Sequence, residues 1–436
     1  MFSPAKYAVR SFLILIVIGT CLLWLPASGA SRGLTFVEAF FTATSAVCVT
    51  GLAVVDTGTD LSLFGQVVLL LLIQLGGLGI MMLSSGAMIL LGRKLGLQEK
   101  KLLKASVPGL QFSGARSLLK GTLFFTFAIE AVGALLLFFC WLPDLGWTKA
   151  FGAAVFHSIS AFCNAGFSLW SDSLTGYATH PVVNLVIMAL IIFGGLGFLL
   201  CTDLTESWRT KRRATLHTRL AWRVTVLLLV GGWILFFLFE SGNTATLGLL
   251  SVPEKLLVSL FQSVTTRTAG FNTVDLGLCK AETLQMMMFL MLIGGCPGST
   301  AGGIKTTTLA VLIVAIANNL KGYNRVVVME RTIPNERVVQ ALAILGITGA
   351  ATWFGAILLS AFEPTTFQGN LFESVSALAT VGLSTGLTAS FSDASKLILC
   401  LYMFAGRVGP LTLAVYLTKP HKEQVIHYAH EDINIG

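Results

Sequence analysis

The chain of 436 residues is too apolar for a soluble protein. Hydrophobic residues make up 55% of it and charged residues only 11%, whereas an average soluble domain carries about a quarter charged residues. The mean hydropathy of +0.81 indicates a polytopic membrane protein. Its eight cysteines lie far apart, with no CxxC pair or Cys/His cluster. They predict neither a disulfide framework nor a zinc site, and we expect small packing residues.

Eight apolar stretches are predicted to cross the membrane, since about 20 mainly apolar residues suffice for one crossing. They cover residues 11–27, 62–92, 119–142, 182–202, 220–240, 282–318, 338–361 and 395–418. Several exceed one crossing, which predicts tilt or interruption. The first could instead be a cleaved signal peptide, because Lys6 and Arg10 precede it and Ser28-Gly29-Ala30 resembles a cleavage site. We prefer a span, since its removal would break the internal symmetry described below.

The basic residues are distributed unevenly between the predicted loops. Segments 1–10, 93–120, 209–223, 321–337 and 419–436 hold 21 of the 29 Lys and Arg residues. This is a positive-inside pattern with both termini in the cytoplasm. It accounts for the net charge of +8 without a nucleic-acid partner.

The opposite segments are acidic, and they include Asp56, Asp60, Asp144, Asp172, Glu254, Asp275, Glu363 and Asp393. An acidic vestibule would raise the local concentration of cations. Ordinary solvated loop charges explain the same residues equally well.

Four outer connections share a short apolar stretch that ends in a glycine segment. They read Ser45-Ala-Val-Cys-Val-Thr-Gly51-Leu52, Ser160-Ala-Phe-Cys-Asn-Ala-Gly166-Phe167, Val264-Thr-Thr-Arg-Thr-Ala-Gly270-Phe271 and Ser376-Ala-Leu-Ala-Thr-Val-Gly382-Leu383. A second glycine cluster follows each in the next span: Gly76-Gly77-Leu78-Gly79, Gly194-Gly195-Leu196-Gly197, Gly294-Gly295-Cys296-Pro297-Gly298 and Gly406-Arg407-Val408-Gly409. This predicts a fourfold repeat of span, re-entrant pore helix and span, with repeats at 1–92, 93–210, 211–320 and 321–436.

Irregular backbone is tolerated at membrane depth only where it is buried in protein or lines a water-filled cavity. Helices that dip inward point their negative C-terminal ends at the membrane centre, which favours a cation. The carbonyls that follow can replace the hydration shell of an ion, and glycine permits the turn. We therefore predict an all-α membrane protein with eight spans and four pore helices around one pseudo-fourfold pore. Helix packing through small residues is the alternative use of these glycines.

The predicted filter comprises four residues from each copy. They are Val49, Thr50, Gly51 and Leu52; Asn164, Ala165, Gly166 and Phe167; Thr268, Ala269, Gly270 and Phe271; and Thr380, Val381, Gly382 and Leu383. This arrangement resembles the Trk/Ktr/HKT superfamily of potassium transporters over nearly the whole chain. Within this superfamily, a chain of eight spans with no two extra spans ahead of them most resembles the membrane subunits of bacterial Ktr potassium-uptake systems. The second half of the TVGYG loop of potassium channels is missing in every copy, so fewer ion sites are expected.

The resemblance implies potassium uptake across the bacterial inner membrane, stimulated by sodium and without a covalent cofactor. It also implies a homodimer and a KtrA-like cytosolic ring subunit that binds a nucleotide. A glycine in the first copy, where some relatives have serine, resembles members that favour potassium over sodium. The basic loops, and the tail at 432–436, are candidate docking sites for the partner or for anionic lipid.

The sixth span contains an unusual run of helix breakers. Residues 294–303 hold five glycines and a proline, and a continuous helix is disfavoured there, since glycine costs about 1 kcal/mol and proline about 3 kcal/mol relative to alanine. We predict a broken helix and, from the resemblance, an intramembrane loop that obstructs permeation. The gate residues are Gly294, Gly295, Pro297, Gly298, Ser299, Thr300, Gly302, Gly303 and Lys305. The likeness of this run to a P-loop is rejected, because Ile304 separates glycine from lysine and no strand precedes it.

Arg407 is the charge that stands out inside a span. Charges at membrane depth are costly and usually face a cavity or a partner. It occupies the repeat position of Gly77 and Gly195, so we expect it at the pore axis as part of the gate, where it opposes cation flow or holds the loop. A helix-capping arginine is the alternative.

Other polar residues in the spans are assigned structural roles. Arg267 is expected to pair with a neighbouring acid such as Glu373, and Glu130 to be packed or paired, a proton relay being the weaker alternative. His157 and His180 are expected to be satisfied structural histidines. The rival functions are a Trk-type or sodium-selective transporter and an intramembrane enzyme. Against the enzyme, the chain has neither HExxH nor a suitably spaced nucleophile and base.

Overall fold

The structure, a computed structural model, describes residues 4–79, 115–323 and 325–409. This part of the chain is mostly helical, as predicted. The longer helices are α1 (Pro4–Trp24), α3 (Leu63–Leu78), α6 (Ala115–Phe162), α7 (Pro181–Thr210), α8 (Leu216–Glu240), α11 (Thr306–Leu320), α12 (Asn335–Phe362) and α14 (Asp393–Val408). Helix α10 (Ala281–Leu292) has only 12 residues. Three further helices, referred to below as the short helices, are α2 (Phe36–Val47), α9 (Val252–Thr265) and α13 (Phe367–Leu378). Strands β1 (Val327–Val328) and β2 (Arg331–Thr332) pair antiparallel between α11 and α12.

Four described segments are long and apolar enough to cross a membrane: Lys120–Phe162, Pro181–Thr210, Leu216–Glu240 and Asn335–Phe362. Shorter apolar helices include Leu63–Leu78, Ala281–Leu292 and Thr306–Leu320. The ends of the predicted spans 62–92 and 395–418 lie outside the described residues, as do most of the basic loop 93–120 and the tail. The chain is therefore a membrane protein with several apolar helices.

A fourth short helix is the C-terminal third of α6. Gly146 has φ 71° and interrupts the helix, so a separate stretch runs over residues 147–162. The starts of α2 and α9 are fixed by capping boxes, in which Thr35 pairs with Glu38 and Ser251 with Glu254. Such caps satisfy N–H groups that lack a partner within the helix. Each of the four short helices ends directly before a glycine segment.

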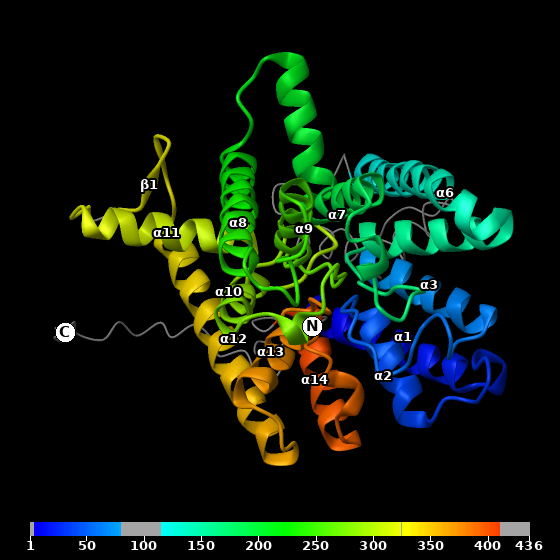
Figure 1. Cartoon of the computed structure of the whole chain (residues 1–436). Helices are drawn as coiled ribbons and strands as arrows, with labels where there is room; N and C mark the ends of the chain where they lie inside the picture. The colour runs from blue at the N-terminus through cyan, green and yellow to red at the C-terminus, as the bar shows by residue number, and fades with distance from the viewer. Residues whose placement is uncertain (1–3, 80–114, 324, 410–436) are drawn as a thin grey trace.

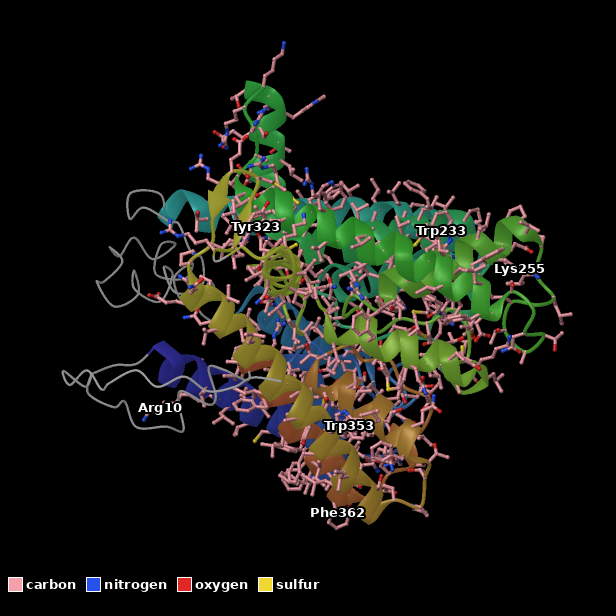
Figure 2. All side chains as sticks on the ribbon, turned by 90° about the vertical axis from the view of Figure 1, so that its left-hand side faces the viewer. Arg10, Trp233, Lys255, Tyr323, Trp353 and Phe362 are labelled. Carbon is pink, nitrogen blue, oxygen red and sulfur yellow. The ribbon has the colours of Figure 1, made fainter. Side chains whose placement is uncertain are left out.

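The helices are grouped in chain order around a common centre. Figure 1 shows α1–α3, α6–α7, α8–α10 and α12–α14 as successive sectors. Within each sector a long helix packs on the short one, as α1 does on α2 and α12 on α13. Figure 2 shows Arg10 of α1 toward one end of the assembly and Lys255 of α9 toward the other. The centre consequently brings together the glycine segments that follow the short helices.

Candidate functional site

The four glycine segments meet in a closed ring. A Cβ atom placed on Gly51 would lie 2.3 Å from the carbonyl oxygen of Ala165, one on Gly166 2.8 Å from that of Ala269, one on Gly270 2.7 Å from that of Val381, and one on Gly382 2.0 Å from that of Thr50. Each contact thus joins one glycine to the carbonyl before the glycine of the next segment. The last returns to the first segment, and a side chain at any of these positions would collide with backbone.

The backbone of each segment is strained in the same way. Val49, Asn164, Thr268 and Thr380 have φ between 51° and 62°, and the glycine two residues later has φ between 71° and 95°. Left-handed backbone is unfavourable for residues with a Cβ atom, and such strain concentrates at functional sites. Four copies of one unusual conformation indicate a single structural task shared by the segments.

Hydroxyl groups on the short helices hold the glycine segments in place. Ser45 Oγ accepts a hydrogen bond from the Gly51 N–H at 3.0 Å, and Ser376 Oγ accepts one from Gly382 at 3.1 Å. Ser160 donates to the Phe167 carbonyl at 2.8 Å and Thr265 to that of Phe271 at 2.5 Å. In three copies the hydroxyl belongs to a serine six residues before the glycine, which the sequence shows directly. Thr265 lies five residues before Gly270, so its equivalent role is visible only in the structure.

A polar cavity opens on one side of the ring. Its volume is about 780 Å³, and all four segment glycines line it together with Asp56, Asp60, Asp172 and Asp275. Burial alone would raise the pKa of Asp56, but hydrogen bonds from Ser171, Thr59 and Gly58 outweigh this and lower it. Asp56 therefore stays ionised at neutral pH and contributes negative potential at the mouth of the cavity.

A second cavity of about 390 Å³ adjoins the residues below the ring. It is lined by Gly76, Gly194, Arg407 and the chain at 298–305. That chain belongs to a loop, residues 293–305, which separates α10 from α11 where the sequence predicted a break. The Gly294 N–H bonds to the Ile304 carbonyl at 2.9 Å and the Ile304 N–H to that of Leu292 at 2.9 Å. The loop is thus closed at its base, and it contains every predicted gate residue except Arg407.

The loop lies directly against three of the glycine segments. Thr300 Oγ1 donates to the Phe162 carbonyl at 3.1 Å and is 3.3 Å from Asn164 Oδ1. The Gly302 N–H donates to Thr268 Oγ1 at 3.2 Å. A Cβ atom on Gly302 would lie 1.9 Å from Thr380 Oγ1, so only glycine allows this approach. The space immediately below the ring is consequently filled by the loop.

Arg407 joins the loop to the opposite side of the cavity. Its Nη1 donates to the Thr300 carbonyl at 2.7 Å and its Nη2 to the Gly76 carbonyl at 2.6 Å. No carboxylate pairs with Arg407 among the described residues. Lys305 Nζ donates to the Ala301 carbonyl at 2.6 Å within the same loop. Two cationic side chains and the loop therefore share one cavity, where backbone carbonyls satisfy their hydrogen bonds.

The predicted pairing of Arg267 with Glu373 is wrong. Arg267 Nη2 donates to the Leu290 carbonyl at 2.5 Å and to Thr266 Oγ1 at 3.2 Å. Glu373 instead accepts hydrogen bonds from the chain at 384–388 in its own sector. The physical reason is proximity. Glu373 on α13 faces residues 384–388, which follow the glycine segment of the same sector, and these residues supply the hydrogen-bond donors that its carboxyl group needs.

The remaining polar residues in the spans have structural contacts. His180 caps α7, its Nδ1 accepting from the Val183 N–H at 3.3 Å. Glu130 is buried, with Oε1 3.9 Å from Cys163 Sγ, and no ion pair forms to it in the described part of the chain. It is therefore packed rather than paired.

Comparison with known proteins identifies the family of the chain. Residues 3–427 match the family model TrkH, described as a cation transport protein. The chain is 40% identical to the Ktr system potassium uptake protein B of Bacillus subtilis (strain 168) over 424 residues, 97% of this chain and 95% of that relative. It is 41% identical to the protein of the same name from Vibrio alginolyticus, covering 99% and 94% of the two chains.

A solved structure shows the same fold. The potassium transporter TrkH from Vibrio parahaemolyticus superposes with a TM-score of 0.73 and 21% identity, covering 94% of this chain and 85% of that one. The relatives found by sequence are transporters and not enzymes, which removes the intramembrane enzyme from consideration. The chain belongs to the TrkH family of cation transport proteins.

Proposed function

We propose that the chain takes up potassium ions through a filter made by carbonyl oxygens of the four glycine segments. The observation that carries the proposal is the closed ring, in which the carbonyl before each glycine lies against the glycine of the neighbouring segment. In this proposal the chain consists of four copies of span, pore helix and span, at the boundaries predicted above, and the pore helices point their C-terminal ends at the ring. Their partial negative charge favours a dehydrated cation at the centre.

The cavities on either side support a path through the ring. The cavity with four aspartates would gather cations from outside, and the cavity with Arg407 and Lys305 would form the cytoplasmic side. The loop at 293–305 then acts as the gate, held under the filter by Arg407. A cation that leaves the ring must displace this loop before it reaches the second cavity.

We propose potassium as the preferred ion, and not sodium, on two grounds: the names of the relatives, and the presence of glycine in all four segments. Two relatives are potassium uptake proteins of Ktr systems, while a third, from Enterococcus hirae, is a potassium/sodium uptake protein with 38% identity. A sodium-selective or Trk-type transporter is therefore the alternative. We further propose inner-membrane insertion with both termini in the cytoplasm, sodium stimulation, a homodimer and a KtrA-like nucleotide-binding partner.

Substitution of one filter glycine tests the proposal. Gly270→Ser adds a side chain where a Cβ would lie 2.7 Å from the Val381 carbonyl and 2.9 Å from Gly166 Cα. In a strain that lacks its own potassium uptake, the wild-type chain should restore growth at low potassium. The variant should lose its potassium preference by about tenfold, equivalent to about 1.4 kcal/mol, measured as inhibition of potassium uptake by sodium.

Gly346→Ser is the matched control, because a Cβ at Gly346 meets nothing within 4 Å. It should retain wild-type preference and uptake. If Gly270→Ser reaches the membrane in normal amount and keeps the potassium preference, the glycine ring serves packing and the proposed filter is refuted.

A further inference from the structure

The four short helices carry a second matched position, three residues before the hydroxyl that holds each glycine segment. It is occupied by Thr42, His157, Gln262 and Glu373. All four side chains are buried, with at most 2% of their surface exposed. Burial of polar groups requires hydrogen bonds, since an unsatisfied one costs stability. The hydrogen-bond partners of these four side chains therefore indicate the structural role of the position.

In three sectors the side chain forms hydrogen bonds to the residues that follow the glycine segment. His157 Nε2 lies 3.1 Å from Ser168 Oγ and accepts from the Leu169 N–H at 3.3 Å. Gln262 Nε2 donates to Thr273 Oγ1 at 3.2 Å. In each case the hydroxyl partner is eleven residues further along the chain.

Glu373 forms the most extensive of these contacts. Its Oε1 accepts from Ser384 Oγ at 2.8 Å, which is again eleven residues further, and from the Thr385 N–H at 2.9 Å. Its Oε2 accepts from Thr388 Oγ1 at 2.5 Å. Its two oxygens accept four hydrogen bonds in all, so the fourth glycine segment has the largest number of these contacts.

The first sector lacks the contact altogether. Thr42 Oγ1 has no hydrogen-bond partner in the described residues, and the residue eleven further is Ala53. A second contact shows the same division. Ser158, Ser263 and Ser374 donate to carbonyls of the adjoining span, those of Glu130, Leu229 and Thr352, at 2.7–2.9 Å. The first short helix has Ala43 at that position.

We propose that His157, Gln262 and Glu373 are selectivity-positioning residues, which hold three quarters of the filter rigid and leave the first quarter compliant. This rests on the proposed carbonyl filter. Discrimination between alkali cations depends on the spacing, number and flexibility of the coordinating carbonyls. A side chain that fixes the chain immediately beyond the filter glycine limits how far its carbonyls can close on a smaller ion. Because Glu373 makes the most contacts, its loss should widen the range of accepted ions most.

Glu373→Gln is the decisive variant, since it keeps the shape of the side chain but replaces one acceptor oxygen with an NH₂ group that can only donate. We expect the preference for potassium over sodium to fall by about tenfold, equivalent to about 1.4 kcal/mol, measured by sodium inhibition of potassium uptake in membrane vesicles. Glu240→Gln is the matched control. Glu240 is equally buried and accepts from Asn243, Thr246 and the Lys280 N–H, but it lies at the end of α8, away from the glycine segments. It should keep the wild-type preference.

Thr42→Ala tests the asymmetry, because it removes a hydroxyl without a partner, and it should leave the preference unchanged. If Glu373→Gln does not reach the membrane, Gln262→Ala replaces it, with an expected fall of about threefold, or about 0.65 kcal/mol. An unchanged preference in the variant that is measured, or an equal fall in Thr42→Ala, would overturn the inference. A loss of preference in Gly270→Ser with none in Glu373→Gln would retain the filter and reject only the positioning role.

Discussion

The helical regions after the second and third glycine segments differ in how they accommodate a glycine cluster. The first region is the single helix α7, and the second is divided into α10 and α11. Both contain a glycine cluster at the same place in the predicted repeat. In α7 the helix passes through it with one non-helical residue, Gly197, at φ 76°. Between α10 and α11 the helix stops for residues 293–305. The difference lies in the number of helix breakers. Three glycines in residues 194–197 leave α7 kinked but continuous, whereas five glycines and a proline in residues 294–303 end the helix.

The two interruptions also depend on one another. The Cys296 N–H bonds to the Gly195 carbonyl at 2.8 Å, and the Thr300 N–H to the Gly194 carbonyl at 3.2 Å. A kink leaves carbonyls of the preceding turn without their partners inside the helix. The kink in α7 therefore supplies two carbonyl acceptors for the loop at 293–305. Through these hydrogen bonds the kinked helix stabilises the loop that interrupts its neighbour.

Among the variants that test this comparison, Arg407→Ala is expected to change potassium uptake most. It removes both hydrogen bonds that join the loop to the far wall of the cavity, and bonds to charged groups are worth about 1.5–3 kcal/mol each. The loop should then leave its closed position more often. Potassium uptake at matched expression should rise by about tenfold or more, a change of at least about 1.4 kcal/mol.

Arg407→Lys separates two explanations for such an increase. Lysine keeps the charge but cannot reach both carbonyls as the guanidinium does. If Arg407 acts as a tether, the lysine variant should also transport faster, whereas if its charge alone opposes the ion, uptake should stay low. Uptake that stays at the wild-type rate in Arg407→Ala would show that Arg407 does not restrain flux.

Gly302→Ala is expected to have an intermediate effect. The new methyl group would lie 1.9 Å from Thr380 Oγ1, so the loop must move away from the glycine segments. We expect uptake to rise by about threefold, or about 0.65 kcal/mol. Gly33→Ala is the control, because Gly33, like Gly302, lacks a left-handed φ, and a Cβ there meets nothing within 4 Å. Equal changes in both variants would show that the effect does not come from the contact between the loop and Thr380.

The smallest effect is expected from Gly197→Ala. Alanine is strained at φ 76°, at a cost of about 1–3 kcal/mol, and its Cβ would lie 2.8 Å from the Gly298 carbonyl. The purified protein should melt a few degrees lower, with uptake changed less than twofold, an effect of under about 0.4 kcal/mol. Gly146→Ala, at the other kink with φ 71° and nothing within 4 Å, should show the strain alone. A normal melting temperature for Gly197→Ala would mean that α7 can straighten.

Sequence patterns anticipated much of this architecture because they record local chemistry. Apolar length predicted the helices, and the density of breakers at 294–303 predicted the gap between α10 and α11. The recurrence of Gly51, Gly166, Gly270 and Gly382 predicted four equivalent segments. Each inference used only the intrinsic preference of a residue for solvent or backbone conformation.

Pairings between distant residues were decided by the tertiary structure. Arg267 and Glu373 have complementary charges, yet each takes its hydrogen-bond partners elsewhere. Arg407 bridges Thr300 and Gly76 across 107 and 331 residues of sequence. No local pattern encodes those distances, because a backbone carbonyl is present in every residue. The sequence by itself determined where the chain is helical and where a helix breaks, whereas only packing determined which backbone groups meet at the centre.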